Sequence, residues 1–253
     1  MKLFGDYHTH TKYSHGTGTV FDNACAAAEQ GLAEIAITDH GFRHLLYHTS
    51  RSKLPDLRRD AENAEKETGV RVLVGVESNL IGTDGFIDVT DEDIENLDII
   101  LCGFHKMIFP HRLTDAFSCA RLNLDWIFGH STKRQIERNT DMYLRALDKY
   151  PIDIITHINY GAKVNLKRIA YKCAEHGTYL ELNGKRVSFS PDDFLEMLET
   201  PVLFIANSDA HSPQRMGDVS LVEDFLGEVY VPSERIVNFG ADAPVFRSRN
   251  RTE

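Results

Sequence analysis

The chain has 253 residues, a formal net charge of −10 and 42% hydrophobic residues, an ordinary composition for a soluble globular protein. This length suits a single α/β barrel domain, and the acidic balance disfavours non-specific binding to nucleic-acid backbones. We expect a cytoplasmic protein, because the N-terminus has no signal-like apolar run and no stretch reaches the roughly 18 apolar residues of a membrane span.

Short apolar runs, rich in β-branched residues, recur along the whole chain. Their length and composition are typical of buried strands. The seven predicted strands are Lys2–Tyr7, Glu34–Thr38, Arg71–Val76, Leu97–Cys102, Ile152–Thr156, Thr178–Leu182 and Val202–Ala206. Longer amphipathic stretches separate most of them and predict helices. The predicted helices are Phe21–Gln30, Leu57–Glu67, the stretch from a Thr132–Gln135 capping box to about Lys149, Asn165–Glu175 and a helix that begins at Pro191.

Strands that alternate with helices predict a parallel sheet covered by helices. We expect one domain over residues 1–253, with 244–253 as a disordered tail. A closed barrel is favoured over an open sheet because of the polar residues at the strand ends, described next. In such barrels, functional groups lie at the C-terminal rim of the strands.

The first predicted strand leads into Asp6-Tyr7-His8-Thr9-His10. Residues two apart in a strand point to the same side, so His8 and His10 face one point together. Paired imidazoles suit divalent zinc, manganese or iron. Alone, such a pair is more often incidental than a metal site.

Further candidate ligands follow the other predicted strands. They are His40 after the second strand, Glu77 after the third, His105 after the fourth, His157 after the fifth, and Asp209 and His211 after the seventh, with His15 in the loop after His10. Each histidine by itself is best explained as a buried residue bonded to a nearby carbonyl. Their convergence at six of the seven strand ends favours a shared metal site and closure of the sheet into a barrel.

Nine candidate ligands exceed the four that one tetrahedral ion takes, so two or three divalent ions are expected. A carboxylate has two oxygens, and Glu77 is the natural bridging ligand. Closely spaced ions are suited to hydrolysis at phosphorus, where they activate water and stabilise charge on oxygen.

Together, the motifs resemble the PHP family (polymerase and histidinol phosphatase). They are Asp6–His10, Thr38-Asp39-His40-Gly41, Gly75-Val76-Glu77, Gly103-Phe104-His105, Glu181-Leu182-Asn183 and Ser208–His211. The resemblance implies a distorted, TIM-like seven-stranded (β/α)7 barrel and places the ligands in three groups. These groups are His8, His10, Glu77 and Asp209; Glu77, His105 and His157; and His15, His40 and His211. It also places Asp39 beside the site, where it could orient a ligand histidine.

For catalysis, we predict functions for Asp39, Glu77, His211 and Arg215. For binding phosphate we predict Arg215 first, then Arg43 and Lys106, since cationic groups pair with phosphate oxygens. Residues 110–131 are a candidate lid, and a packed helix is an equal alternative for them.

The predicted activity is metal-dependent hydrolysis of a small phosphomonoester by activated water, with histidinol phosphate as one option that the resemblance implies. A nuclease or phosphodiesterase is the main alternative, although the sequence has no basic stripe for nucleic acid. An amidohydrolase and a metal-binding regulator without turnover rank below it.

Overall fold

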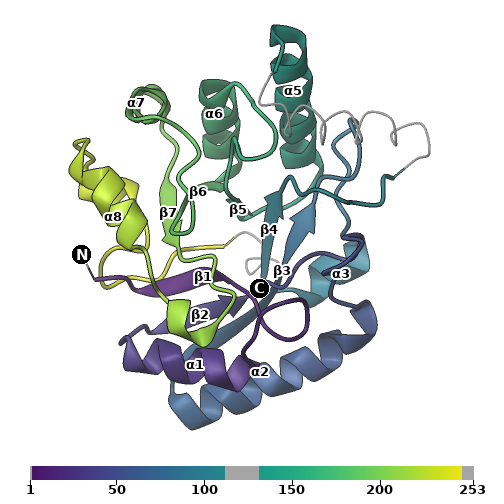
Figure 1. Cartoon of the computed structure of the whole chain (residues 1–253), viewed down its shortest axis with the longest axis vertical. Helices are drawn as coiled ribbons and strands as arrows, with labels where there is room; N and C mark the ends of the chain where they lie inside the picture. Colours follow the sequence, from purple (N-terminus) through teal and green to yellow (C-terminus); the bar gives the residue numbers. More distant parts are fainter. Residues whose placement is uncertain (1, 112–130, 247–253) are drawn as a thin grey trace.

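The computed structural model describes residues 2–111 and 131–246. Its centre is a sheet of parallel strands that follow one another in chain order around a barrel (Figure 1). The strands are β1 (Gly5–Thr9), β2 (Glu34–Ile37), β3 (Arg71–Asn79), β4 (Ile99–Gly103), β5 (Ile154–Ile155), β6 (Tyr179–Asn183) and β7 (Phe204–Asn207). All seven predicted strands and the barrel-type α/β fold are confirmed.

The barrel closes in two different ways between β1 and β7. At the C-terminal end of the strands, Thr9 and Ala210 form a parallel bridge, and the amide of His10 donates to the Ala210 carbonyl at 2.8 Å. Towards the other end, Asn238 of the C-terminal segment stands between the two strands. Its side chain bonds the Gly5 carbonyl on one side and the backbone of Ala206 on the other. The segment therefore completes the hydrogen bonding where β1 and β7 do not pair directly.

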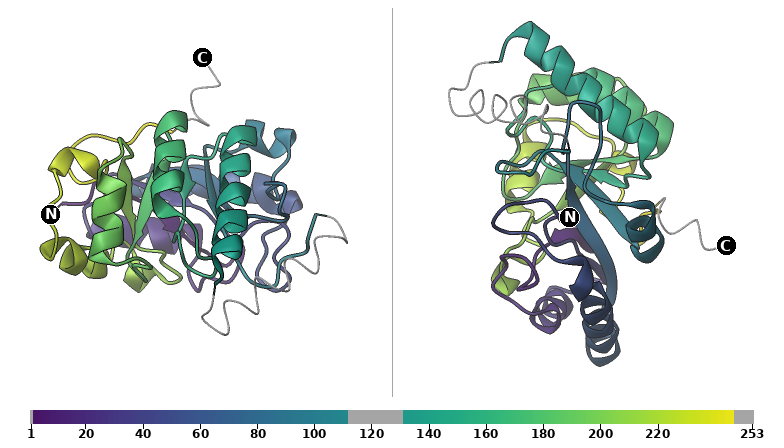
Figure 2. Two further views of the ribbon diagram at one scale, coloured as in Figure 1. Left: turned by 90° about the horizontal axis from the view of Figure 1, so that it is seen from above. Right: turned by 90° about the vertical axis from the view of Figure 1, so that its right-hand side faces the viewer.

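Helices cover the outside of the sheet. Their bounds are α1 (Val20–Glu29), α2 (Leu54–Thr68), α3 (Asp91–Asn96), α5 (Lys133–Lys149), α6 (Leu166–His176), α7 (Pro191–Leu198) and α8 (Ser220–Gly227). In Figure 1, α1 and α2 lie on one outer side and α5, α6 and α7 on the other. Seen from above in Figure 2, α5, α6 and α7 stand side by side. No helix of the described segments is both long and apolar enough to cross a membrane.

Local sequence signals account for the helix ends. The predicted capping box is present at Thr132, whose hydroxyl accepts from the amide of Gln135. Gly177 ends α6 in the left-handed conformation, with φ of 65°, which a residue without Cβ adopts at little cost. The short helices α3 and α8 were not predicted, because six or eight residues give too few turns for a clear apolar period and neither helix begins with a proline, the signal that marked the equally short α7.

The barrel interior is apolar at the N-terminal end of the strands. Tyr7, Leu73, Ile99 and Tyr179 meet there, and Phe246 enters from the C-terminal segment. The Phe246 ring is 1% exposed and lies 4.9 Å from the Tyr7 ring, centroid to centroid. The predicted disordered tail is therefore wrong for residues 244–246, which close this end of the barrel. The remainder, 247–253, lies outside the described residues.

Candidate metal centre

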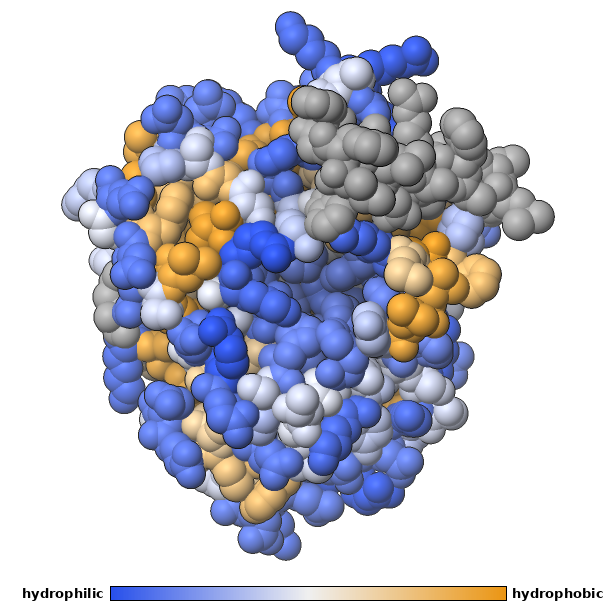
Figure 3. Space-filling model, viewed as in Figure 1, coloured by the Kyte–Doolittle hydropathy of each residue, from blue (hydrophilic) through white to orange (hydrophobic). Residues whose placement is uncertain are grey.

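A cavity of about 310 Å³ opens at the C-terminal ends of the strands. Figure 3 shows a hollow within the hydrophilic centre of one face of the molecule. The described residues that line the cavity are His15, His40, His44, Tyr47, Glu77, Phe104, His105, Lys106, Met107, His157, Tyr160, Gly161, Asn183, Lys185, Arg186, Asp209 and His211. The loops after six different strands thus contribute side chains to one space, as the predicted convergence requires.

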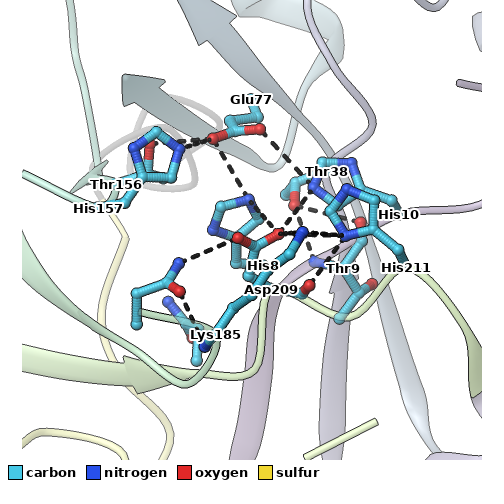
Figure 4. Close-up of polar contacts among 12 residues, drawn as sticks. His8, Thr9, His10, Thr38, Glu77, Thr156, His157, Lys185, Asp209 and His211 are labelled. Carbon is cyan, nitrogen blue, oxygen red and sulfur yellow. Dashed lines mark hydrogen bonds and ion pairs between the residues drawn. The ribbon is translucent and has the colours of Figure 1, made fainter. Parts of the chain in front are cut away.

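Glu77 on β3 lies at the centre of the histidine cluster. Its carboxylate is fully buried, with Oε1 2.8 Å from His157 Nε2 and 3.0 Å from His105 Nε2, and Oε2 2.9 Å from His40 Nδ1. His8 Nε2 lies 3.3 Å from Oε1, and Figure 4 shows His8 and His157 directed at this carboxylate. Burial alone would raise the pKa of Glu77, but the surrounding imidazoles hold it well below its usual value. Glu77 is therefore an anion with both oxygens turned to histidines.

His10 provides the observation that best fits a metal ion. Its ring is fully buried, yet neither ring nitrogen has a hydrogen-bond partner among the residues that the structure describes. Burial, together with His40, His211 and His8, keeps the pKa of His10 well below its usual value, although Asp209 opposes this effect. The ring is therefore neutral and carries a free lone pair. A buried polar atom without a partner costs stability, and coordination to a cation would remove that cost.

Three overlapping sets of ligand atoms are close enough together to hold an ion, and His10 and His40 each belong to two of these sets. The sets are His8, His10 and Asp209; His40, Glu77 and His105; and His10, His40 and His211, with all atoms of a set within 4.8 Å of one another. The first set agrees with the expected grouping. The other two differ from it, because His40 belongs with Glu77 and His105, while His10 replaces His15. The His15 ring still lies 4.9 Å from the His40 ring and 4.4 Å from the His211 ring.

Glu181 on β6 contacts two of the candidate ligands, His8 and His157, a function that we did not predict. Its fully buried carboxylate lies 2.7 Å from His8 Nδ1 and accepts the amide of His157, also at 2.7 Å. A proton on His8 Nδ1 leaves the Nε2 lone pair directed at the Glu77 and Asp209 side of the site. Carboxylates behind ligand histidines fix the ring and raise its basicity. The motif Glu181-Leu182-Asn183 was the sequence signal for this residue.

Asp39 has a different contact from the one expected. Its carboxylate accepts from the amide and hydroxyl of Thr11, at 2.8 and 2.6 Å, and from the Ser14 hydroxyl. The described residues include no hydrogen bond from Asp39 to a ligand histidine. Burial raises the pKa of Asp39 to about 6, against the lowering effect of these hydrogen bonds. Asp39 therefore holds the loop that carries His15, and does not orient an imidazole.

The expected phosphate-binding residues are only partly placed at the cavity. Lys106 lines it, as predicted. Arg215 does not, since its guanidinium pairs with Asp218 at 2.8 Å and reaches the Gly184 carbonyl. Arg43 also points elsewhere and donates to the Pro110 carbonyl at 2.9 Å. Backbone and carboxylate partners thus direct both side chains away from the cavity in this structure. The predicted functions of Arg215 in catalysis and phosphate binding, and of Arg43 in phosphate binding, stay predictions that this arrangement does not support.

Two cations that we did not predict line the cavity instead, and both follow β6. Lys185 Nζ lies 3.8 Å from Asp209 Oδ1 and 3.3 Å from His211 Nδ1 (Figure 4), and Arg186 is its neighbour. Their position two and three residues beyond Asn183 was an available signal, because residues just after a barrel strand face the rim. The candidate lid at 110–131 lies almost entirely in 112–130, outside the described residues.

His44 is a further cavity histidine that was absent from the predicted set. Its Nδ1 accepts the amides of Leu46 and Tyr47, at 3.3 and 3.1 Å. These two bonds require the neutral ring to carry its proton on Nε2, so His44 offers the cavity a donor and not a metal-binding lone pair.

The fold and the ligand cluster define a barrel with a candidate multinuclear metal centre at its C-terminal rim. The PHP domain family matches residues 6–185, which is more than half of the chain. The chain therefore belongs to the PHP family.

Proteins that resemble the chain over most of its length agree with this assignment. A protein of Shewanella piezotolerans named "Probable phosphatase" is 27% identical over 258 residues, which cover 96% of this chain and 92% of that protein. A probable phosphatase of Caldanaerobacter subterraneus subsp. tengcongensis is also 27% identical and covers 96% of this chain and 89% of its own.

Among solved structures, the histidinol phosphate phosphatase of Lactococcus lactis, complexed with zinc, L-histidinol and phosphate, has a TM-score of 0.58. It is 14% identical, and the match covers 90% of this chain and 93% of that one. At this identity, the likeness establishes a shared fold.

Proposed function

We propose that this protein is a metal-dependent phosphatase that hydrolyses small phosphomonoesters. The observation that carries the proposal is the Glu77 carboxylate, buried among four imidazole nitrogens beside a fully buried His10 without hydrogen-bond partners. The family match and the relatives named as probable phosphatases support phosphoester hydrolysis.

The residues that would hold the ions come from the nine predicted ligands, seven of which belong to the three ligand sets. Imidazoles with a few carboxylates suit zinc, manganese or iron, and the number of ligand sets suits two or three ions. When bound, such ions would supply an acidified water and positive charge to stabilise oxygens on phosphorus. Glu77 would bridge, because its two oxygens face different histidines, and Glu181 would keep His8 in the tautomer that binds.

The chain's own cations would hold the substrate phosphate. Lys185 lies beside Asp209 and His211, so its ammonium reaches the edge of the ligand cluster. His44 can donate a hydrogen bond to a phosphate oxygen from its Nε2. A cavity of about 310 Å³ lies within the range of small-molecule sites. It suits a small phosphomonoester and would admit only the end of a polymer.

A panel of aryl substrates tests the proposal. Protein stripped with a chelator should be inactive, and zinc, manganese or iron(II) should each be tried for restoring phosphate release from 4-nitrophenyl phosphate. Comparable turnover of bis(4-nitrophenyl) phosphate would favour a phosphodiesterase. Turnover of an amide or cyclic ureide without phosphatase activity would replace the proposal with an amidohydrolase.

A further inference from the structure

We propose that the cavity holds a second anion-binding subsite, formed by Arg186 on Tyr160 together with Lys106. The preferred substrate would then be a phosphomonoester whose alcohol part carries its own negative charge, a carboxylate or a second phosphate. This inference rests on the proposed phosphatase function and names the substrate class for it.

The loop after β6 is held so that its cations face the cavity. Asn183 Oδ1 accepts the amides of both Lys185 and Arg186, at 2.9 and 3.0 Å. Asn183 Nδ2 in turn donates to Glu181 Oε2 at 2.9 Å and reaches Asp209 Oδ2 at 3.3 Å. The turn that carries the two cations is therefore fixed to the candidate metal centre. Binding of a ligand then costs little further conformational entropy in this turn.

Arg186 is held by a neighbouring loop. Its guanidinium carbon lies 3.9 Å from the centre of the Tyr160 ring, which follows β5. Asn159 joins the loops after β5 and β6 by donating to the Ser188 carbonyl at 3.0 Å. The backbone of Asn159 has a φ of 70°, a left-handed conformation that is uncommon outside glycine. A guanidinium stacked on a ring keeps its N–H edge available, and that edge matches a carboxylate or phosphate in bidentate fashion.

The charges around the cavity explain the preference for a second anion. Lys106, Lys185 and Arg186 all line it. Its carboxylates, within the described segments, are Glu77 and Asp209, and both are candidate metal ligands. An ammonium on the substrate, such as that of histidinol, would meet these cations, and residues 2–111 and 131–246 offer it no carboxylate there beyond the two candidate ligands. A second anionic group on the substrate would instead bind Arg186, because the first phosphate would already contact the ions and Lys185.

A matched substrate series tests this inference on the metal-loaded enzyme. The series consists of glycerol 3-phosphate, 3-phosphoglycerate, propane-1,3-diol bisphosphate and L-histidinol phosphate, and kcat/KM is measured for each. We expect 3-phosphoglycerate or the bisphosphate to exceed glycerol 3-phosphate by about tenfold or more, as a charged hydrogen-bonded pair allows, and histidinol phosphate to be the poorest. The relative rates of 3-phosphoglycerate and the bisphosphate, the two substrates with an anionic tail, decide between carboxylate and phosphate. The preference should shrink as ionic strength rises.

The Arg186→Gln variant should reduce that preference about tenfold, mostly through KM, and Arg186→Lys should restore part of it because the charge remains. Arg168→Gln is the matched control, since Arg168 lies on α6 and pairs with Glu137 and Asp141 at the surface. Thermal unfolding of each variant checks that it folds.

Two kinds of failure are distinguishable. Hydrolysis of none of the phosphomonoesters would overturn the proposed function itself. A phosphatase that prefers histidinol phosphate, or an anion preference that Arg186→Gln leaves unchanged, would overturn the subsite and leave the phosphatase proposal standing.

Discussion

The two ends of the barrel contain the same kind of strand but opposite kinds of side chain. Along β3, the alternate residues Leu73, Gly75 and Glu77 point in the same direction, and they change from an apolar core residue to a buried carboxylate within five positions. On β4 the alternation continues from Ile99 into the loop residue His105. The N-terminal end is packed with apolar groups, whereas the C-terminal end concentrates buried polar atoms that lack partners.

The two ends therefore contribute to the free energy of unfolding with opposite sign. Packing of Tyr7, Tyr179 and Phe246 stabilises the fold, while unpartnered nitrogens such as those of His10 destabilise the metal-free protein. Changes at the two ends should therefore separate activity from stability.

The largest effect is expected from Glu77→Gln. An amide cannot bridge cations as a carboxylate does, so phosphatase activity should fall by about a thousandfold or more, with loss of bound metal. The matched control is Glu34→Gln at the opposite end of the neighbouring strand, where Glu34 lies 3.4 Å from Arg71. Metal analysis and phosphate release would check both variants. A fully metallated, active Glu77→Gln protein would contradict the site.

Phe246→Ala should lower stability and leave activity unchanged. Loss of a buried ring should lower the free energy of unfolding by about 3 kcal/mol, because the barrel cannot refill the space. Metal content and kcat of the folded protein should stay near those of the wild type. Urea unfolding measures the loss, and Val245→Ala, at a neighbouring side chain that is 64% exposed, is the control. A similar loss in both variants would show that the buried Phe246 ring contributes little to the free energy of unfolding.

The smallest effect is a dependence of stability on pH in metal-free protein. Burial lowers the pKa of His40 to about 3 and of His15 and His44 to about 4, each from 6.5. At these three histidines the unfolded chain binds more protons below pH 6.5, so their contribution lowers the free energy of unfolding as the pH drops from 6.5 towards 4. Asp39, with its pKa raised to about 6, opposes part of this loss because the folded chain binds the extra proton there. His8 and His157 have raised pKa values, so their contribution is complete below pH 6.5 and is lost only as the pH rises above it.

Urea unfolding at pH 6.5 and pH 5 in the presence of a chelator measures this dependence. His40→Gln should make it shallower, while His176→Gln, at an α6 residue far from the cavity, should leave it unchanged. Equal free energies of unfolding at the two pH values would show that the buried histidines do not destabilise the protein at pH 5.

Much of the site followed from the sequence because strands have a period of two. Glu77 and His105 lie in phase with interior core residues, so their direction could be predicted without tertiary contacts. Three candidate ligand positions break that period. The pairing of β1 with β2 shifts between Asp6 and Thr9, on either side of His8, while His157 and Asp209 have positive φ values of 28° and 53°. The sequence identified these residues as candidates, but backbone irregularity decides how they reach the site.

The sequence by itself determined the order of the strands, the barrel class and the set of candidate metal ligands, because these depend on apolar periodicity and on residues close to strand ends. Tertiary structure decided which cations face the cavity, why Glu181 supports His8, and how Phe246 fills the far end. Those features depend on side-chain contacts between segments up to about 240 residues apart, which local patterns do not encode.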